Sequence, residues 1–301
     1  MSQQLVDGNR TMKNLARQLF SDVQMLTALG ERSTRHPAAL DQAAELLFTR
    51  FTELEYGVRE QSFKAEGVTC RNIEAIPRGF SAKVPHLLIG AHYDSAPGTP
   101  GADDNASAVA ILLALAKRFA ARAGGSRFRF VAFTNEEPPH FYTPTMGSTV
   151  FAKACAKRGD QLYAMICLES LGVFSNAQGS QLLPEGISLG QIPPGFDPTV
   201  GNFVAVVGNA ESMDMAHAFA GSFDGRMPAV AVELPELELS DHLSFWHAGF
   251  RAIMLTDTAL FRNEHYHLPT DTAEKLDYEK MAAVTGCIGD AVERWHATRS
   301  S

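Results

Sequence analysis

Histidine and carboxylate side chains follow several apolar segments of this sequence, and their types suit one kind of chemistry. His92 and Asp94 follow one apolar run, Glu136 and Glu137 follow a second, and Glu169 follows a third. Neutral imidazole and carboxylate groups are ligands that zinc accepts in catalytic sites. Hydrolysis at a paired-metal site needs imidazoles, several carboxylates, and one carboxylate left over as a base.

Two further segments supply groups of the same types. Asp103 and Asp104 are consecutive in Gly101-Ala-Asp-Asp-Asn105, before an expected helix, and His267 follows the last expected strand by a loop. One aspartate or Asn105 can cap the helix while another acid points into a cleft. Taken as a set, the acids would repel one another unless cations neutralised them. A metal site therefore explains the set better than a structural role.

The adjacent pair Glu136-Glu137 can serve two purposes at once. At a strand end the chain turns, so both side chains can reach one site. If one Glu binds metal, the other is free to take a proton from water, and burial among acids would raise its pKa toward neutrality.

Composition restricts the class of protein. The chain has 26 basic and 34 acidic residues, a net charge of −8, and this balance argues against nucleic acid or an anionic membrane as partner.

Its four cysteines form no Cys-x-x-Cys pair, so a cysteine zinc site is not expected. The N-terminus has no apolar signal segment, and no apolar run reaches the roughly 20 residues of a membrane span. We expect a cytoplasmic protein; its oligomeric state cannot be read from the sequence.

The elements that must position these groups alternate between strand and helix. Residues from about 10 to 55 have helical apolar spacing, and the two strands that follow are joined by a turn at Glu66-Gly67 and add antiparallel edges. The alternation predicts an α/β fold with three layers, α/β/α, and a mixed, mostly parallel sheet of about eight strands in a single domain over residues 1–301. The expected strands are 56–63, 70–76, 86–92, 128–133, 162–168, 203–207, 229–232 and 252–255, and the later helices are 105–121, 146–157, 212–223, 241–248 and 277–295.

In open α/β sheets, sites form at the carboxyl ends of the strands, and each candidate lies at or after such an end. Residues 175–202 are rich in Gly, Pro, Ser and Gln, and this length predicts a loop that rims the site. Phe141, Tyr142, Phe174 and Phe245 could line an apolar pocket, although plain packing is the alternative.

The ordered motifs resemble the co-catalytic zinc aminopeptidase family of zinc exopeptidases. That family also contains glutaminyl cyclases, glutamate carboxypeptidase-like enzymes and some non-catalytic receptor ectodomains. The resemblance runs from about Tyr56 to Tyr278. Its motifs are Ala91-His-Tyr-Asp-Ser, Pro100-Gly-Ala-Asp-Asp-Asn-Ala-Ser, Asn135-Glu-Glu-Pro-Pro, Met146-Gly-Ser, Ser240-Asp-His and Tyr266-His…Asp271-Thr.

The resemblance implies two zinc ions per chain and a role for each residue. Asp103 would bridge the ions, His92 and Glu169 would complete one site, and Glu137 and His267 would complete the other. Carboxylate-rich sites also accept Mn²⁺ or Co²⁺.

Further roles are implied outside the ligand set. Glu136 would be the general base, and Asp94 would orient the first histidine. A non-proline cis peptide would follow the bridging aspartate, between Asp103 and Asp104.

Two departures from the family pattern affect the assignments. Many aminopeptidases of the family have Asp at the position that corresponds to Glu169. The Tyr that some members place before Ser-Asp-His is missing, so we name His242 as the group that polarises the substrate, with a packed helix-start histidine as the alternative. Asp241 would support the site from outside the ligand set or cap the helix.

The function that follows is metal-dependent exopeptidase activity, with an aminopeptidase acting on peptides as the first choice. A single-zinc glutaminyl cyclase, a carboxypeptidase with an Arg-lined pocket, and a non-catalytic binding module are the alternatives. Residues 175–202 contain no Arg, which disfavours the carboxypeptidase.

Overall fold

The computed structural model describes residues 2–120, 127–184, 196–223, 225–234 and 239–298. Within them the strands form one mixed sheet of eight, in the order β1-β2-β4-β3-β5-β8-β6-β7. This confirms the predicted three-layer fold with a mixed sheet. The strands are β1 Gly57–Ala65, β2 Val68–Ile76, β3 His86–His92, β4 Phe128–Phe133, β5 Leu162–Glu169, β6 Val204–Gly208, β7 Ala229–Glu233 and β8 Ala252–Thr256.

The centre of the sheet is parallel and its two sides are antiparallel. Strand β3 pairs in parallel with β4 and β5, and β8 pairs in parallel with β5. The early hairpin β1–β2 joins β4 in antiparallel fashion, as expected. On the other side β6 runs antiparallel to β8. Because β3, β4, β5 and β8 run the same way, their carboxyl ends meet at one edge of the sheet.

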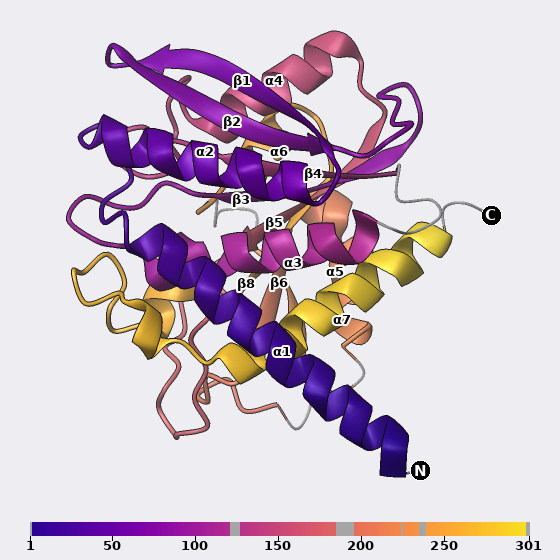
Figure 1. The fold of residues 1–301 in the computed structure, drawn as a ribbon. Helices are drawn as coiled ribbons and strands as arrows, with labels where there is room; N and C mark the ends of the chain where they lie inside the picture. The colour runs from indigo at the N-terminus through magenta and orange to yellow at the C-terminus, as the bar shows by residue number, and fades with distance from the viewer. Residues whose placement is uncertain (1, 121–126, 185–195, 224, 235–238, 299–301) are drawn as a thin grey trace.

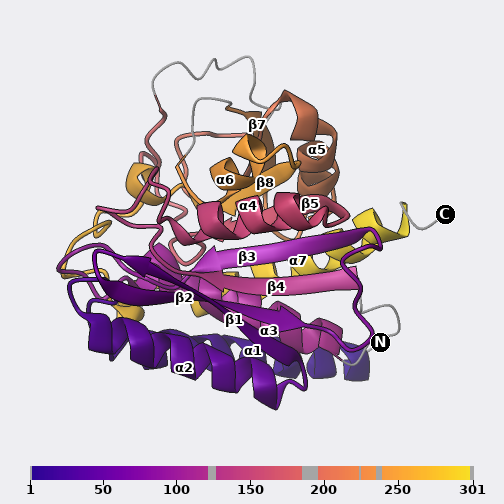
Figure 2. The ribbon, with the colours of Figure 1, turned by 90° about the horizontal axis from the view of Figure 1, so that it is seen from above.

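The central strands are buried on both faces, which explains their continuous apolar sequence. Every residue of β3 and β4 is buried, whereas the residues of edge strand β1 are mostly exposed or half-buried. Figure 2 shows the sheet between its two helical layers. A buried strand end leaves polar groups without water, so the groups that follow β3, β4 and β5 must find partners inside the protein.

Two layers of helices cover the sheet (Figure 1). Helices α2, α3, α5 and α7 share one apolar core with the sheet, and α1 packs across α3 and α7. Helices α4 and α6 pack against each other and against the opposite face. The helices are α1 Ser2–Thr27, α2 Pro37–Glu53, α3 Ala108–Ala120, α4 Gly147–Arg158, α5 Met213–Gly221, α6 His242–His247 and α7 Tyr278–Ala297.

The third helix begins later than predicted. Regular α3 starts at Ala108 rather than at residue 105, because Asp104 and Asn105 have non-helical backbone angles within an irregular turn over Ala102–Ser107. The peptide bond between Asp104 and Asn105 is cis. The sequence prediction placed this bond one residue earlier, between Asp103 and Asp104, and was wrong in that respect.

Among the described residues, no helix combines the length and the apolar character that crossing a membrane requires.

Candidate metal centre

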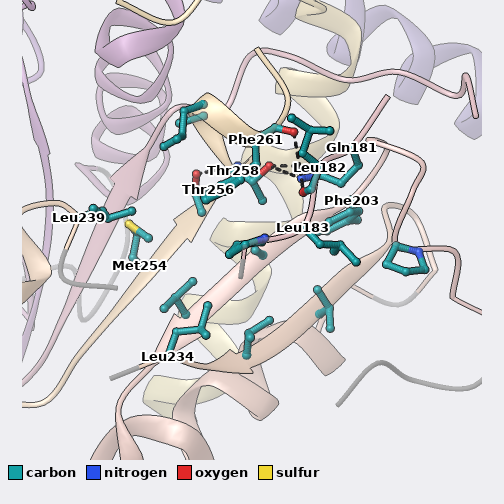
Figure 3. Close-up of a pocket in the computed structure, with 18 of the residues that line it drawn as sticks. Gln181, Leu182, Leu183, Phe203, Leu234, Leu239, Met254, Thr256, Thr258 and Phe261 are labelled. Carbon is teal, nitrogen blue, oxygen red and sulfur yellow. Dashed lines mark hydrogen bonds between the residues drawn. The ribbon is translucent and has the colours of Figure 1, made fainter. Parts of the chain in front are cut away.

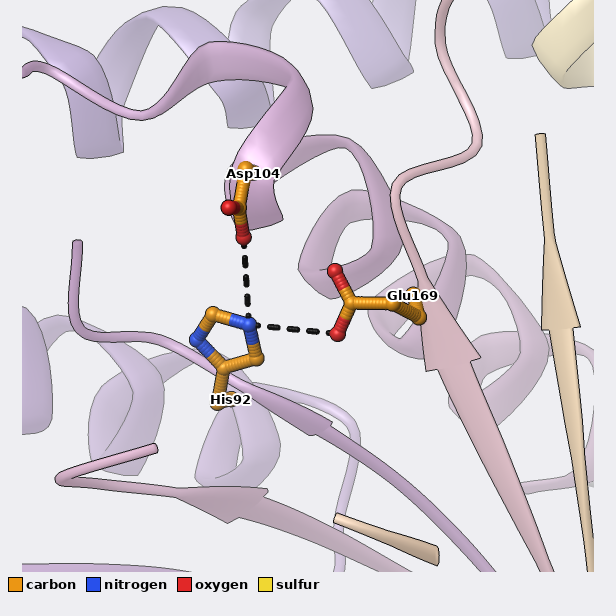
Figure 4. Close-up of side chains that lie close together, drawn as sticks. All are labelled: His92, Asp104 and Glu169. Atoms are coloured by element: carbon orange, nitrogen blue, oxygen red, sulfur yellow. Dashed lines mark ion pairs between the residues drawn. The ribbon is translucent and has the colours of Figure 1, made fainter. Parts of the chain in front are cut away.

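The first cluster of side chains forms where β3 and β5 end. His92 is the last residue of β3 and Glu169 the last of β5, and both are buried. The His92 Nε2 atom lies 3.2 Å from Oδ1 of Asp104 and 3.2 Å from Oε2 of Glu169. Figure 4 shows the two carboxylates pointing toward this one ring nitrogen.

The second cluster shares Asp104 with the first. Its other oxygen, Oδ2, lies 3.1 Å from Nε2 of His267, and Oε2 of Glu137 lies 3.3 Å from the same nitrogen. Burial opposes ionisation of Asp104, but the imidazoles of His267 and His92 outweigh it and lower the pKa of Asp104. One carboxylate oxygen of Asp104 therefore faces the first cluster, and the other faces the second.

Asp103, which the sequence analysis chose as the bridging residue, points elsewhere. Its Oδ1 accepts a hydrogen bond from the Gly172 amide at 2.9 Å, and its Oδ2 accepts one from the Asn263 side chain at 2.9 Å. Consecutive residues in the turn send their side chains in different directions, so only one aspartate of the pair can face both histidines. The structure therefore places Asp104, and not the predicted Asp103, between the two histidines.

The two clusters have the composition of a metal centre. Each contains one imidazole and two carboxylates whose ligand atoms lie within 4.8 Å of one another. Both ring nitrogens of His92 and Oε1 of Glu137 are buried without a hydrogen-bond partner. Buried polar atoms normally have partners, and nitrogen with oxygen donors suits zinc. The five residues therefore fit bound metal, and Asp104 is common to both clusters.

Glu136 lies beside the clusters and belongs to neither. Its Oε2 is 3.7 Å from Nε2 of His92, and the residue is buried. Burial, together with the neighbouring carboxylates of Glu137 and Glu169, raises the pKa of Glu136 well above its usual value. A carboxylate in this position can accept a proton near neutral pH.

Asp94 connects the ends of β3 and β4. Its oxygens accept hydrogen bonds from the main-chain amides of Glu136 at 3.1 Å and of Glu137 at 3.0 Å. Its Oδ1 also lies 3.5 Å from Nδ1 of His92. One carboxylate thus orients the first histidine and holds the glutamate pair in place.

Two supporting residues were missed by the sequence analysis. The Asp271 carboxylate accepts hydrogen bonds from the amides of Asp103 at 3.0 Å and of Asp104 at 3.3 Å. Ser240 donates to Oε2 of Glu169 at 2.6 Å. Both residues belong to motifs named above, Ser240-Asp-His and Asp271-Thr. Their place in these motifs was the only feature of the sequence that could have identified them.

The structure places His242 and Asp241 at the start of α6. His242 is buried and packs edge-on against Trp246, with ring centroids 4.6 Å apart. Neither residue belongs to the two clusters, and the Asp241 side chain makes no capping hydrogen bond. Burial raises the pKa of Asp241 to about 7. His242 thus occupies the packed helix-start position that was the alternative to substrate binding.

An apolar pocket opens beside the first cluster (Figure 3). It has a volume of about 950 Å³ including its mouth, and Glu169 and Tyr266 contribute to its wall. Strands β6, β7 and β8 contribute mostly small and aliphatic side chains to the remaining wall, and the segments around Leu182, Phe203 and Phe261 contribute further apolar side chains. Leu182 and other described residues of the predicted 175–202 loop contribute to this wall. Residues 185–195 of that loop lie outside the described residues.

The four aromatic residues proposed from sequence do not line this pocket in the described structure. Phe245 packs against Phe133 and Phe250 instead. Tyr266, which was not proposed, lies between pocket and clusters. Its ring stacks on that of His267, with centroids 3.9 Å apart and planes 14° apart. Burial, with the carboxylates of Asp104 and Glu137, raises the pKa of Tyr266, so its hydroxyl stays protonated.

Comparisons with known proteins agree with this geometry. The model of peptidase family M28 matches residues 73–292, more than half of the chain. The uncharacterized protein YfbL of Escherichia coli is 38% identical over 285 residues, covering 89% of this chain and 84% of YfbL.

Two solved structures have the same fold. BSAP, a zinc aminopeptidase from Bacillus subtilis, has a TM-score of 0.70 at 15% identity, with 93% of this chain and 95% of that chain covered. The glutaminyl cyclase of Porphyromonas gingivalis has a TM-score of 0.67 at 18% identity, with 93% and 98% covered. Since an aminopeptidase and a cyclase match equally well, the fold alone does not select the reaction.

Proposed function

Because the chain belongs to peptidase family M28, we propose that it is a zinc-dependent aminopeptidase with two ions per chain and Glu136 as general base. The observation that carries this proposal is the position of Asp104. Its Oδ1 lies 3.2 Å from His92 and its Oδ2 lies 3.1 Å from His267, so one carboxylate serves both clusters.

The ligand roles follow from the clusters. Asp104 would bridge the ions; His92 and Glu169 would complete one site, and Glu137 and His267 the other. When bound, zinc would supply Lewis acidity toward the scissile carbonyl and toward water.

Glu136 moves the proton in this mechanism. Its buried carboxylate accepts a proton from the attacking water and returns it to the leaving amine. The raised pKa of Glu136 suits this transfer, since it makes the carboxylate a stronger base toward the attacking water. Asp94 holds Glu136 in place through the main-chain amide.

Tyr266 takes the role first assigned to His242. Its ring lines the pocket and stacks on His267, and its hydroxyl keeps its proton, so it can donate a hydrogen bond to the substrate carbonyl. The support for this assignment is the position of the ring at the junction of pocket and clusters.

The pocket supports an apolar N-terminal residue in the substrate. Its wall contains Glu169, which belongs to the first cluster, together with apolar side chains such as Val207 and Met254. A carboxypeptidase for acidic residues needs cationic groups, and none of the described lining residues is Arg or Lys. The substrate side chain that fits this wall is aliphatic or aromatic.

The alternative reaction is glutaminyl cyclisation, favoured by the structural likeness to the cyclase. A single-zinc cyclase would leave one of the two clusters without an ion. Both clusters are complete in this chain, and the spare Glu136 is present, which supports hydrolysis and disfavours a non-catalytic binding module.

A substrate screen combined with metal analysis tests the proposal. Zinc-replete protein is assayed with leucyl and alanyl amides, a cyclisable glutaminyl peptide, and a peptide ending in glutamate. We expect two zinc ions per chain and fastest release from the leucyl amide. One zinc ion with pyroglutamate formation would contradict hydrolysis, and release of the terminal glutamate would identify a carboxypeptidase.

A further inference from the structure

Arg32 is a fully buried cation in the loop between α1 and α2. Its relative exposure is 0%, which is rare for an arginine. A buried guanidinium must be hydrogen-bonded, because moving an unpartnered charge out of water is costly. The partners of Arg32 therefore show what it is there to hold.

The guanidinium joins two of the chain segments that carry residues of the clusters, the one with His92 and the one with Asp104. Its Nε donates to the carbonyl of Tyr93 at 2.8 Å, between His92 and Asp94. On the second segment it donates to the carbonyls of Pro100 at 2.5 Å and of Gly101 at 3.2 Å, just before Asp104. The nitrogen that donates to Pro100, Nη1, also lies 3.1 Å from the carbonyl of Gly30 and 3.4 Å from that of Leu26.

Among the residues that the structure describes, Arg32 forms no direct ion pair. Each of these hydrogen bonds goes to a neutral main-chain carbonyl. The acids that its charge attracts are Asp94, Asp271, Asp104 and Glu137, all in or next to the clusters. Burial lowers the pKa of Arg32 to about 10, so the side chain is still cationic at neutral pH.

We propose that Arg32 is a built-in counter-charge for the carboxylates of the metal centre, which holds them together when no metal is bound. This inference rests on the proposed metal centre. Clustered carboxylates repel one another, and a fixed cation beside them reduces that repulsion. Once metal ions enter, the same cation opposes them, so Arg32 also weakens metal affinity. It acts as a positioning residue and does not touch the substrate.

Three variants separate charge from packing. Arg32→Met removes both the charge and the hydrogen bonds, whereas Arg32→Lys keeps the charge and loses most of the hydrogen bonds. Ser95→Ala is the matched control, at a residue on the segment after β3 that contacts the Arg32 main chain. The Ser95 hydroxyl accepts a hydrogen bond from the Arg32 amide at 3.0 Å and donates to the Thr99 carbonyl at 3.0 Å, and its loss changes no charge.

The measurements are the zinc dissociation constant, by competition with a chelating dye, and the thermal midpoint with and without zinc. We expect Arg32→Met to bind zinc more tightly than Arg32→Lys, by roughly 10-fold. Its metal-free form should melt below metal-free Arg32→Lys, and its midpoint should rise more when zinc is added. Ser95→Ala should resemble the wild type in zinc affinity.

Equal or weaker zinc binding by Arg32→Met than by Arg32→Lys would overturn the counter-charge and leave the proposed function intact. A wild-type chain that binds no zinc would contradict the metal centre itself. If Arg32→Met does not fold, the charge-balanced double variant R32M/D271N is tested. A folded metal-free double variant supports the proposal, and its failure to fold overturns it.

Discussion

At the scale of single residues, the centre depends on which of two adjacent aspartates faces the histidines. Asp104 reaches both clusters, while Asp103 is satisfied by Gly172 and Asn263. The two residues have the same side chain and differ only in direction. They therefore form a natural matched pair for mutagenesis.

Asp104→Asn should abolish binding at both sites, because the amide replaces the anionic oxygens that face His92 and His267. We expect zinc affinity to fall by more than about 100-fold, beyond the loss typical of outer partners. Asp103→Asn is the control. It should lower zinc affinity by about 10-fold or less, since it removes no ligand. Metal content by elemental analysis checks both variants; equal losses would contradict the assignment of Asp104.

Glu136→Gln should separate metal binding from turnover. Glu136 belongs to neither ligand cluster, so the variant should retain its zinc. Without the carboxylate that accepts the proton, kcat should fall by about 10³-fold. Parallel measurements of zinc content and of leucyl amide hydrolysis test this, and near-normal turnover would remove Glu136 from the mechanism.

At the scale of elements, strand direction assembles the centre and strand faces shape the pocket. The parallel strands β3, β4 and β5 deliver His92, the glutamate pair and Glu169 to one edge. Alternate residues of β6, β7 and β8 supply one part of the pocket wall. A change on one face of these strands should therefore alter specificity, and a change on the other face should not.

Ala205→Leu in β6 adds an apolar side chain to the pocket wall. We expect the ratio of kcat/KM for leucyl over alanyl substrates to fall by about 10-fold, as expected when a pocket loses space for a few methylene groups. The matched control is Ala231→Leu, because Ala231 pairs with Val206 and faces the opposite core. A ratio that changes equally in both variants would place the substrate side chain elsewhere.

At the scale of the whole molecule, one continuous sheet supports both centre and pocket, and α1 and α2 pack on the same core as α3 and α7. This arrangement supports the proposal that residues 1–301 form a single catalytic domain. It also places the five buried or half-buried residues of the two clusters in one region, so bound metal should affect the stability of the fold.

Removal of zinc by a chelator should lower the thermal midpoint, because ligand that binds only the native state stabilises it. At a free zinc concentration about 1,000 times the dissociation constant, the effect is about 4 kcal/mol, or roughly 6 °C for a chain of this size. Differential scanning fluorimetry with and without chelator measures it. Asp104→Asn should be insensitive to the chelator, and a chelator effect of the same size in that variant would argue for a different binding site.

The alternation of apolar strands and helices was sufficient to predict the α/β fold, since periodicity is a local property of the sequence. Residue types and their order at strand ends likewise indicated an acid and imidazole site. The antiparallel placement of β6 against β8 was not predicted, because strand pairing depends on contacts between distant segments.

What the sequence by itself determined is the chemical inventory of the centre: His92, Glu136, Glu137, Glu169 and His267 at or after strand ends. Only the tertiary structure decided that Asp104 rather than Asp103 faces both histidines. It also decided that Arg32 and Asp271 support the same turn, and that Tyr266 rather than His242 borders the pocket. The physical reason is that side-chain direction in an irregular turn depends on backbone torsion angles and distant partners, and neither is encoded in the spacing of residues along the chain.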